Sequence, residues 1–264
     1  NVPLSGAIAR GGPGMLITLN GDQVPGGRAE QGYIRNADSH TAASLHFSGV
    51  IEVSGNQRLR IETWKKGNPG NITLPEGKQA SLFIEKLGDS GVFSASATET
   101  VDGIDFNPDV ATQIAWKSPS IIDRALYSSN TSSGAVTVKE AGNYLLVYND
   151  ALESSIQRAA PKITVEVNGN PVAGAMASTQ YIRSLNGHNS SSASIVFLLD
   201  SLSANDDITV STVREAQAGE VLADFDPALL ALIKKPNFVP DPSNGLAPRL
   251  SSFSAEFSGF DVGL

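Results

Sequence analysis

Apolar and polar residues alternate with a period of two over short runs of this chain, which is the pattern of half-buried β-strands. The clearest runs are Ser44–Val53, Arg58–Thr63, Val92–Thr100 and Gly134–Lys139. Turn residues separate the runs, and helix-period segments do not alternate with them. The sequence therefore predicts an all-β protein built from antiparallel β-sandwiches.

Two further runs add detail to this picture. Met15–Leu19 ends at Asn20-Gly21, a strong hairpin signal. In Tyr144–Tyr148 both faces are apolar, because the aromatic residues alternate with aliphatic ones. We expect this strand to be buried on both sides.

The chain contains one pattern twice. Leu19–Ser44 aligns with Val167–Ser192 at a constant offset of 148, and 15 of the first 44 positions are identical to the positions 148 residues later. Later segments match at an offset of 148 to 149. The repeat predicts tandem sandwiches of about 149 residues, a length that suits a jelly roll better than an immunoglobulin domain of about 100 residues.

The alignment of the two copies divides the chain into three predicted parts. Residues 1–87 are the back portion of one repeat, residues 88–236 a complete repeat, and residues 237–264 an extended tail or the start of a further repeat. The first part lacks the strands that residues 92–148 supply to the second. We expect either that the native polypeptide continues upstream of Asn1 or that another chain fills the gap.

The local sequence and the repeat alignment predict different secondary structures for Phe225–Lys235. Asp226-Pro227 is a good helix start, yet Leu229–Pro236 aligns with Ala80–Leu87. Because equivalent positions of a repeat should adopt the same structure, we predict a strand here.

Composition excludes several classes of function. The net charge is -8 without a basic block, which disfavours nucleic-acid binding. The absence of cysteine excludes disulfides and zinc–thiolate sites. No apolar run approaches the roughly 18 residues of a membrane span, so membrane insertion is not expected.

Gly134–Tyr148 and Leu202–Val210 resemble the signature of the C1q/TNF-like jelly-roll family: a strand, a turn with Gly, an aromatic-rich buried strand and a later Asn-Asp turn. The resemblance implies a homotrimer with aromatic residues of the buried strand near the threefold axis. It makes Tyr144, Leu146 and Tyr148 candidates for the trimer interface. The alternative is that both faces of this strand are covered within one chain.

Repeated polar residues form a candidate ligand surface. His40 and His188 are equivalent, and Tyr-Ile-Arg precedes each of them. A Tyr and an Arg on one strand face could bind a sugar or a carboxylate; the alternative is a structural pair that was copied with the fold. The candidates are Tyr33, Arg35, His40, Tyr181, Arg183 and His188.

No catalytic signature or cofactor motif occurs in the chain, so an enzyme is not expected and no cofactor is predicted. Acidic clusters could bind Ca²⁺, although turns recruit the same residue types. These clusters are Asn205–Asp207, Asp224 with Asp226, and Asp102 with Asp105 and Asp109.

Together the features predict a trimeric, non-enzymatic structural protein located in a virion or at a cell surface. Tandem C1q/TNF-like units without cysteine are similar to virion components of tailed bacteriophages, namely capsid decoration, head-fibre or tail-fibre proteins. The expected partners are further copies of the chain, other virion or surface structural proteins, and glycans. The alternative function is a bacterial adhesin or carbohydrate-binding module, and a polysaccharide-degrading enzyme is a third, weaker possibility.

Overall fold

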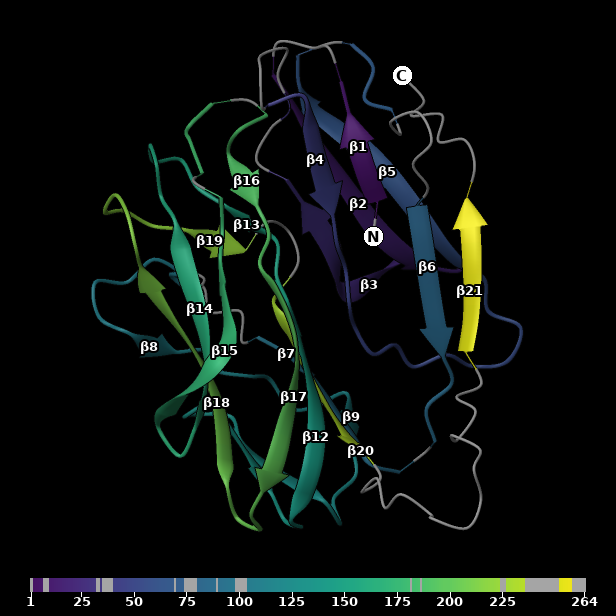
Figure 1. The fold of residues 1–264 in the computed structure, drawn as a ribbon, viewed down its shortest axis with the longest axis vertical. Helices are drawn as coiled ribbons and strands as arrows, with labels where there is room; N and C mark the ends of the chain where they lie inside the picture. The colour runs from purple at the N-terminus through teal and green to yellow at the C-terminus, as the bar shows by residue number, and fades with distance from the viewer. Residues whose placement is uncertain are drawn as a thin grey trace.

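The structure is a computed structural model. It describes the chain except residues 1, 7–9, 32–33, 35–39, 69, 74–79, 89, 98–103, 181, 186, 224–226, 236–251 and 258–264, and it describes Ser252–Phe257 by their backbone. The described residues form strands and no helices (Figure 1). We call residues 1–87 the first unit and residues 88–236 the second unit.

The second unit is a sandwich of two antiparallel sheets. Across one sheet the strands are β10 (Tyr127–Asn130), β11 (Ala135–Val138), β18 (Asp207–Arg214), β14 (Pro161–Val167) and β15 (Asn170–Ser178), with β8 (Thr112–Gln113) also on β18. Across the other they are β17 (Ser194–Leu202), β12 (Gly142–Asn149), β20 (Leu229–Lys235), β7 (Val92–Ser96) and β9 (Ile121–Ile122). Neighbouring strands come from distant parts of the sequence, as in a jelly roll, so the prediction of an all-β jelly-roll sandwich is confirmed for this unit.

Aromatic side chains fill the space between these sheets. Tyr127 and Tyr144 meet edge to face with ring centroids 5.9 Å apart, and Trp116 and Tyr148 do so at 6.4 Å. All four are buried. Tyr127 also donates its hydroxyl hydrogen bond to the carbonyl of Gly91 at 2.9 Å. The core therefore combines apolar burial with specific aromatic geometry.

The first unit contains fewer strands. They are β1 (Val2–Ser5), β2 (Gly11–Leu19), β3 (Asp22–Glu30), β4 (Ala42–Leu45), β5 (Leu59–Gly67) and β6 (Ala80–Glu85), and β6 pairs with the tail strand β21 (Ser252–Phe257). β3, β2 and β5 form one sheet, and β1 pairs with β4. A small separate core includes Leu4, Met15, Ile34, Leu45 and Ile72.

Strand registers in the two units are the same. The β2–β3 pairs run from Gly14↔Glu30 to Leu19↔Asp22, and the β14–β15 pairs run from Lys162↔Ser178 to Val167↔Asn170, each 148 residues later. Both hairpins contain a register irregularity at the same place. Both turn at an Asn-Gly pair with positive φ at both residues, as a type I′ turn requires. The predicted hairpin at Asn20-Gly21 is confirmed.

Two other strand predictions have different outcomes. Leu229–Lys235 is the strand β20, although its local sequence favours a helix, because it pairs with β12 on one edge and β7 on the other. The prediction of one strand over Ser44–Val53 was wrong in its extent. β4 ends at Leu45, and residues 46–53 form no strand. The equivalent strand β17 is held by pairing with β12, and no described strand pairs with residues 46–53.

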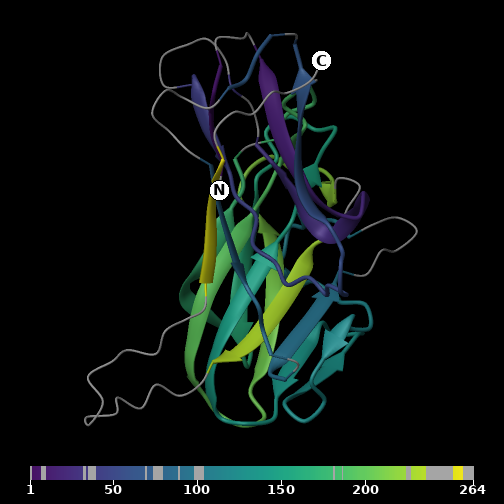
Figure 2. The same cartoon turned by 90° about the vertical axis from the view of Figure 1, so that its right-hand side faces the viewer.

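The strands of the first unit lie against one end of the second unit (Figure 2). Backbone and buried polar groups join the two units. Asn149 donates from Nδ2 to the carbonyl oxygens of Gly26 at 3.1 Å and Arg28 at 2.9 Å. The amide of Glu30 donates to Ser192 Oγ at 2.7 Å. Because Asn149 is fully buried, these bonds lie away from solvent and fix the contact between β3 and the end of β12.

A buried ion pair supports the same region of β3. The carboxylate of Glu30 accepts hydrogen bonds from Arg28 Nε at 2.9 Å and from Lys66 Nζ at 3.0 Å. The Arg28 guanidinium also lies 4.4 Å from the centre of the Trp64 ring, a cation–π geometry. Glu30 is buried, so its charge is compensated by two cations rather than by water.

We predict that Asn149→Ala lowers the free energy of unfolding by about 1–3 kcal/mol, because two buried carbonyl groups lose their donor. Urea denaturation monitored by tryptophan fluorescence measures the change. Asn143→Ala is the matched control: its side chain accepts from the amide of Ser201 at an exposed position of the same strand, where water can replace it. Equal effects of the two variants would contradict a role for Asn149 in the junction.

Candidate functional site

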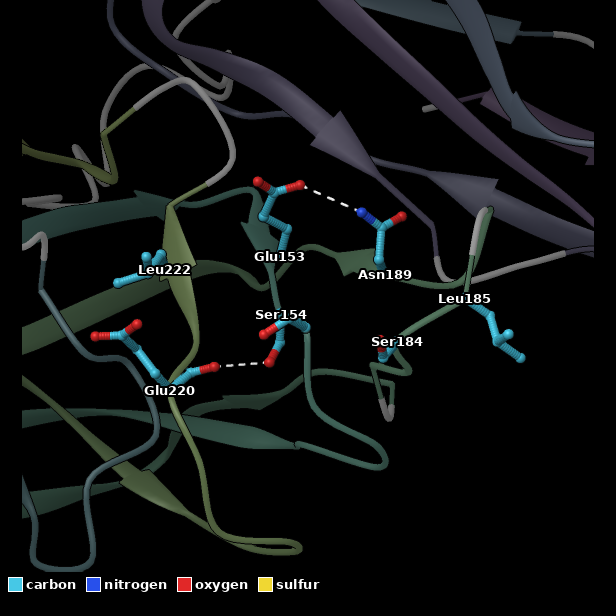
Figure 3. A pocket seen from close by; sticks show the side chains of 8 residues that line it. Glu153, Ser154, Ser184, Leu185, Asn189, Glu220 and Leu222 are labelled. Carbon is cyan, nitrogen blue, oxygen red and sulfur yellow. Dashed lines mark hydrogen bonds between the residues drawn. The ribbon is translucent and has the colours of Figure 1, made fainter.

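A polar pocket of about 530 Å³ opens beside a small three-stranded sheet of the second unit (Figure 3). This sheet consists of β16 (Ser190–Ser191), β13 (Leu152–Glu153) and β19 (Leu222–Ala223). The lining residues are Glu153, Ser154, Ser155, Ser184, Leu185, Asn189, Glu220 and Leu222. None of them is basic, so the pocket suits a neutral, hydroxyl-rich ligand better than an anion.

Hydrogen bonds position the polar groups of the pocket. Asn189 Nδ2 donates to Glu153 Oε2 at 3.3 Å, and Figure 3 shows the two side chains facing each other. Ser154 donates from Oγ to the carbonyl of Glu220 at 2.6 Å. Asn189 Oδ1 is buried and has no hydrogen-bond partner among the described residues. The pocket thus presents acceptors on a firm backbone, as a site for sugar hydroxyls would.

The loop after β15 carries two of the predicted ligand residues. The amide of Arg183 donates to the carbonyl of His188 at 2.8 Å, and the amide of His188 donates to Leu185 at 2.8 Å. His188 is buried and Arg183 is half-buried. These bonds give the loop a compact turn, and its Ser184, Leu185 and Asn189 line the pocket.

Gly187 in this loop touches the first unit. A Cβ atom on Gly187 would lie 2.8 Å from the Cα of Gly67, and one on Gly12 would lie 2.8 Å from the carbonyl oxygen of Gly187. Gly187 also has a φ of 77°, which disfavours any other residue. The loop therefore forms part of the junction between the units.

The structure describes three of the six predicted ligand residues, namely His40, Arg183 and His188. Tyr33, Arg35 and Tyr181 lie outside the described residues. His40 is exposed in the first unit, whereas its counterpart His188 is buried. Of the described candidates, Arg183 and His188 lie in the loop that lines the pocket, and ligand binding by these residues stays a prediction.

Glu153, Asn189 and Glu220 were not among the residues predicted from the sequence. By the alignment of the units their counterparts are Ser5, Thr41 and Asn71. The predicted ligand residues are identical in the two copies of the repeat, whereas these pocket residues differ between the copies. Differences between the copies could have indicated the pocket residues.

A second buried acid follows β12 directly. Asp150 accepts hydrogen bonds from the Tyr148 hydroxyl at 2.7 Å and from the amide of Ala193 at 2.5 Å. Burial raises the pKa of Asp150 to about 7, and the two hydrogen bonds offset only part of this shift. Burial and the neighbouring Asp150 also raise the pKa of Tyr148. Near neutral pH Asp150 therefore exists in both protonation states.

We predict that Asp150 makes the folded state less stable as the pH rises from about 4 to about 7. In this range the folded state holds a proton that the unfolded state has lost, so stability falls by up to about 1.4 kcal/mol per pH unit and levels off above pH 7. Asp150→Asn should remove this dependence. Thermal melts of both proteins across the range measure it, with Asp200→Asn, an exposed acid, as the control. Parallel pH profiles for wild type and Asp150→Asn would contradict the prediction.

The side chains predicted for a trimer interface point into the sandwich. Tyr144, Leu146 and Tyr148 are fully buried within one chain. Since β12 alternates between two faces, its larger aromatic face fills the core and its aliphatic face is turned outward. The structure thus places these three residues where the alternative interpretation expected them, covered within the chain.

The outward face of β12 continues into an exposed apolar surface. Leu145 pairs with Leu198, and Val147 pairs with Val196, on the neighbouring edge strand β17. Val196 is 49% exposed and Leu198 is 50% exposed. Leu145 is half-buried. We call Leu145, Val196 and Leu198 the β17 face.

Part of the same sheet surface is already covered by the first unit. A Cβ atom on Gly26 or Gly49 would lie 2.4 or 3.2 Å from the side chain of Leu229. Leu229 on β20 is buried as a result. The β17 face is the part of this surface that the first unit leaves open.

The acidic clusters serve as turn and surface groups where they are described. Asp206 accepts from the amide of Ser203 and from Asn168 Nδ2, each at 2.8 Å. Asp105 accepts from the amides of Asn107 and Val221, at 2.9 and 3.1 Å. Asp109 forms an ion pair with Arg214.

In the described part of the chain, no three His, Cys, Asp or Glu side chains lie together as metal ligands would. Asp102, Asp224 and Asp226 lie outside the described residues. Calcium binding by the acidic clusters stays a prediction.

Similar folds occur among solved structures. Murine APRIL at pH 8.0 is 17% identical with a TM-score of 0.38, and the match covers 55% of this chain and 98% of APRIL. The Eiger TNF of S. frugiperda is 14% identical with a TM-score of 0.41, covering 59% of this chain and 98% of Eiger. No protein-family model and no curated protein matches the sequence. The jelly-roll assignment therefore rests on the strand order given above.

Among the described residues, no helix is long and apolar enough to cross a membrane.

Proposed function

We propose that this protein is a non-enzymatic structural protein that assembles as a homotrimer outside the cytoplasm. The proposed place is the virion of a tailed bacteriophage, as a capsid decoration, head-fibre or tail-fibre protein. The observation that supports assembly is the β17 face, where large aliphatic side chains stand exposed on an edge strand.

An exposed apolar surface of this kind favours association. Burying apolar area contributes about 25 cal/mol per Å², so covering the exposed halves of Val196 and Leu198 in each copy would stabilise a complex. The β17 face continues a surface that the first unit already covers at Leu229. Further copies of the same chain are the proposed occupants, since the C1q/TNF-like resemblance of Gly134–Tyr148 implies a trimer.

The proposal of a non-enzymatic role is supported by the chemistry of the described polar groups. Asp150 and Tyr148 are hydrogen-bonded to each other but fully buried, so a substrate cannot reach them. His46 Nε2 and Ser48 Oγ are 2.8 Å apart, yet they lie on an exposed segment outside the pocket. Glu153 and Glu220 line the pocket, where Glu153 accepts a hydrogen bond from Asn189 Nδ2, an arrangement that suits binding.

We predict that Val196→Asp and Leu198→Asp convert a trimer into monomers, because each places a charge in the buried contact. Light scattering and native mass spectrometry measure the change. Met176→Asp is the matched control, since Met176 is also an exposed apolar residue but lies on β15 of the other sheet. A monomeric wild-type protein, or a trimer that survives both β17 substitutions, would contradict the proposed assembly.

The virion role has a separate test. Capsids that lack the protein should be less resistant to heat, and addition of the purified trimer should restore their resistance. Failure to bind capsids or virions, with the trimer intact, would reject this role and leave the assembly standing.

A second candidate function, glycan binding by an adhesin, is favoured by the polar pocket. We predict that a glycan retained on an array is lost in Glu153→Ala and in Asn189→Ala, because each removes one partner of the hydrogen bond that positions the pocket side chains. Asp22→Asn, at the exposed first position of β3 in the first unit, should bind as wild type does. If wild type and all three variants retained the glycan equally, the glycan would bind outside the pocket. If wild type retained no glycan, the adhesin function would be rejected.

A further inference from the structure

The pocket beside β13 and β19 lies in the more acidic part of the chain. Residues 88–236 contain 17 Asp and Glu against nine Lys and Arg, whereas residues 1–87 contain seven against nine. Two of these acids, Glu153 and Glu220, line the pocket, and its described lining contains no Lys, Arg or His. The charge around the pocket therefore favours a cationic ligand.

Paired backbone positions both acids of the pocket. Glu153 on β13 pairs with Leu222 on β19, and Glu220 lies just before β19. The carbonyl of Glu220 also accepts a hydrogen bond from Ser154 Oγ at 2.6 Å. Figure 3 shows the Glu153 and Glu220 side chains coming from these two neighbouring segments. A ligand in the pocket would thus meet carboxylates carried by two elements of one small sheet.

Both carboxylates are free to compensate the charge of a ligand. Neither Glu153 nor Glu220 forms an ion pair within the described part of the chain. The first unit has the neutral residues Ser5 and Asn71 at the equivalent positions. The two negative charges are therefore not required for folding of the repeat.

The hydrogen-bonding groups positioned at the pocket are mainly acceptors. The Glu153 carboxylate can only accept, and Asn189 Nδ2 uses one of its several lone-pair sites. Ser154 Oγ has given its hydrogen to the Glu220 carbonyl and accepts from the amide of Ile156 at 3.1 Å. Asn189 Oδ1 is buried and has no partner among the described residues. A ligand that brings several donors matches this arrangement.

The size and the apolar lining of the pocket suit a sugar ring better than a bare ion. The pocket volume is about 530 Å³, within the roughly 300–1,000 Å³ of small-molecule sites. Leu185 and Leu222 add apolar surface, and Figure 3 shows them on either side of Ser154. A sugar presents C–H groups to such surface and hydroxyl groups to the polar residues.

We propose that the pocket binds a sugar that carries a free ammonium group, with the charge compensated by Glu153 and Glu220. The inference rests on the second candidate function, glycan binding by the pocket, and narrows its ligand to amino sugars. A primary ammonium group has three donors and no acceptor, so it supplies what the pocket lacks. An N-acetylated sugar of the same ring structure has no charge and offers fewer donors.

The test compares two ligands of equal length on the full chain, a glucosamine tetramer and an N-acetylglucosamine tetramer. Isothermal titration calorimetry at about pH 6, where a primary amine is protonated, measures both affinities. We expect the glucosamine tetramer to bind roughly tenfold more tightly or better. Because Glu220 is exposed, this preference should decrease as the salt concentration rises.

Variants that remove charge but keep side-chain shape link the preference to the pocket. Glu153→Gln and Glu220→Gln should each reduce the preference for the glucosamine tetramer severalfold, and the double variant should abolish it. Asp200→Asn is the matched control, because it removes one negative charge from an exposed position of the same unit. It should bind both tetramers as wild type does. Thermal melts of each variant check that the fold is retained.

The outcomes separate this inference from glycan binding itself. Equal affinity for the two tetramers would overturn the amino-sugar assignment and leave the pocket as a site for neutral glycans. Full preference in the double Gln variant would also overturn it, because the ammonium group would then bind elsewhere. Tetralysine binding as tightly as the glucosamine tetramer would overturn the assignment to a sugar. No binding of either tetramer would overturn it as well, and the array result decides separately whether the pocket binds another glycan.

Discussion

A strand in the middle of a sheet must hydrogen-bond along both of its edges, and the position of β12 shows how much depends on this requirement. β12 holds β17 on one side and β20 on the other, and its aromatic face fills the sandwich between them. The same segment ends in Asn149 and Asp150. Asn149 hydrogen-bonds to the first unit, and Asp150 accepts a hydrogen bond from the amide of Ala193. Where the equivalent strand is not present among the described residues, residues 46–53 form no strand although their sequence alternates as a strand should.

This dependence explains which features the sequence could predict. The hairpins at Asn20-Gly21 and Asn168-Gly169 are local, since two residues with positive φ determine the turn and the register follows from it. The strand at Leu229–Lys235 could be predicted only through its repeat partner, because its local signals favour a helix. The length of β4 could not be predicted, since it depends on a neighbour distant in the sequence. Alternation shows that a segment can be a strand, and pairing decides whether it is one.

The candidate site was harder to predict for a related reason. The Tyr-Ile-Arg and His residues were predicted to bind a ligand because both copies contain them. In the structure, however, His188 is buried beside the junction and His40 is exposed. Residues kept in both copies need not share a role once one copy packs against the other. The pocket instead uses Glu153, Asn189 and Glu220, which the first copy lacks. The sequence predicted Tyr144, Leu146 and Tyr148 for a trimer interface, and pleat geometry turns these side chains to the core and Leu145 outward. A trimer contact at this strand stays a prediction.

The contact of Gly12, Gly67 and Gly187 has a consequence for any larger assembly. At this contact the main chains of the two units meet with no side chain between them, so a residue larger than glycine at Gly12 or Gly187 would push the units apart. Substitutions on the outer surface do not alter this contact between the two main chains. A filament that repeated it would keep the same pitch while its exterior diversified.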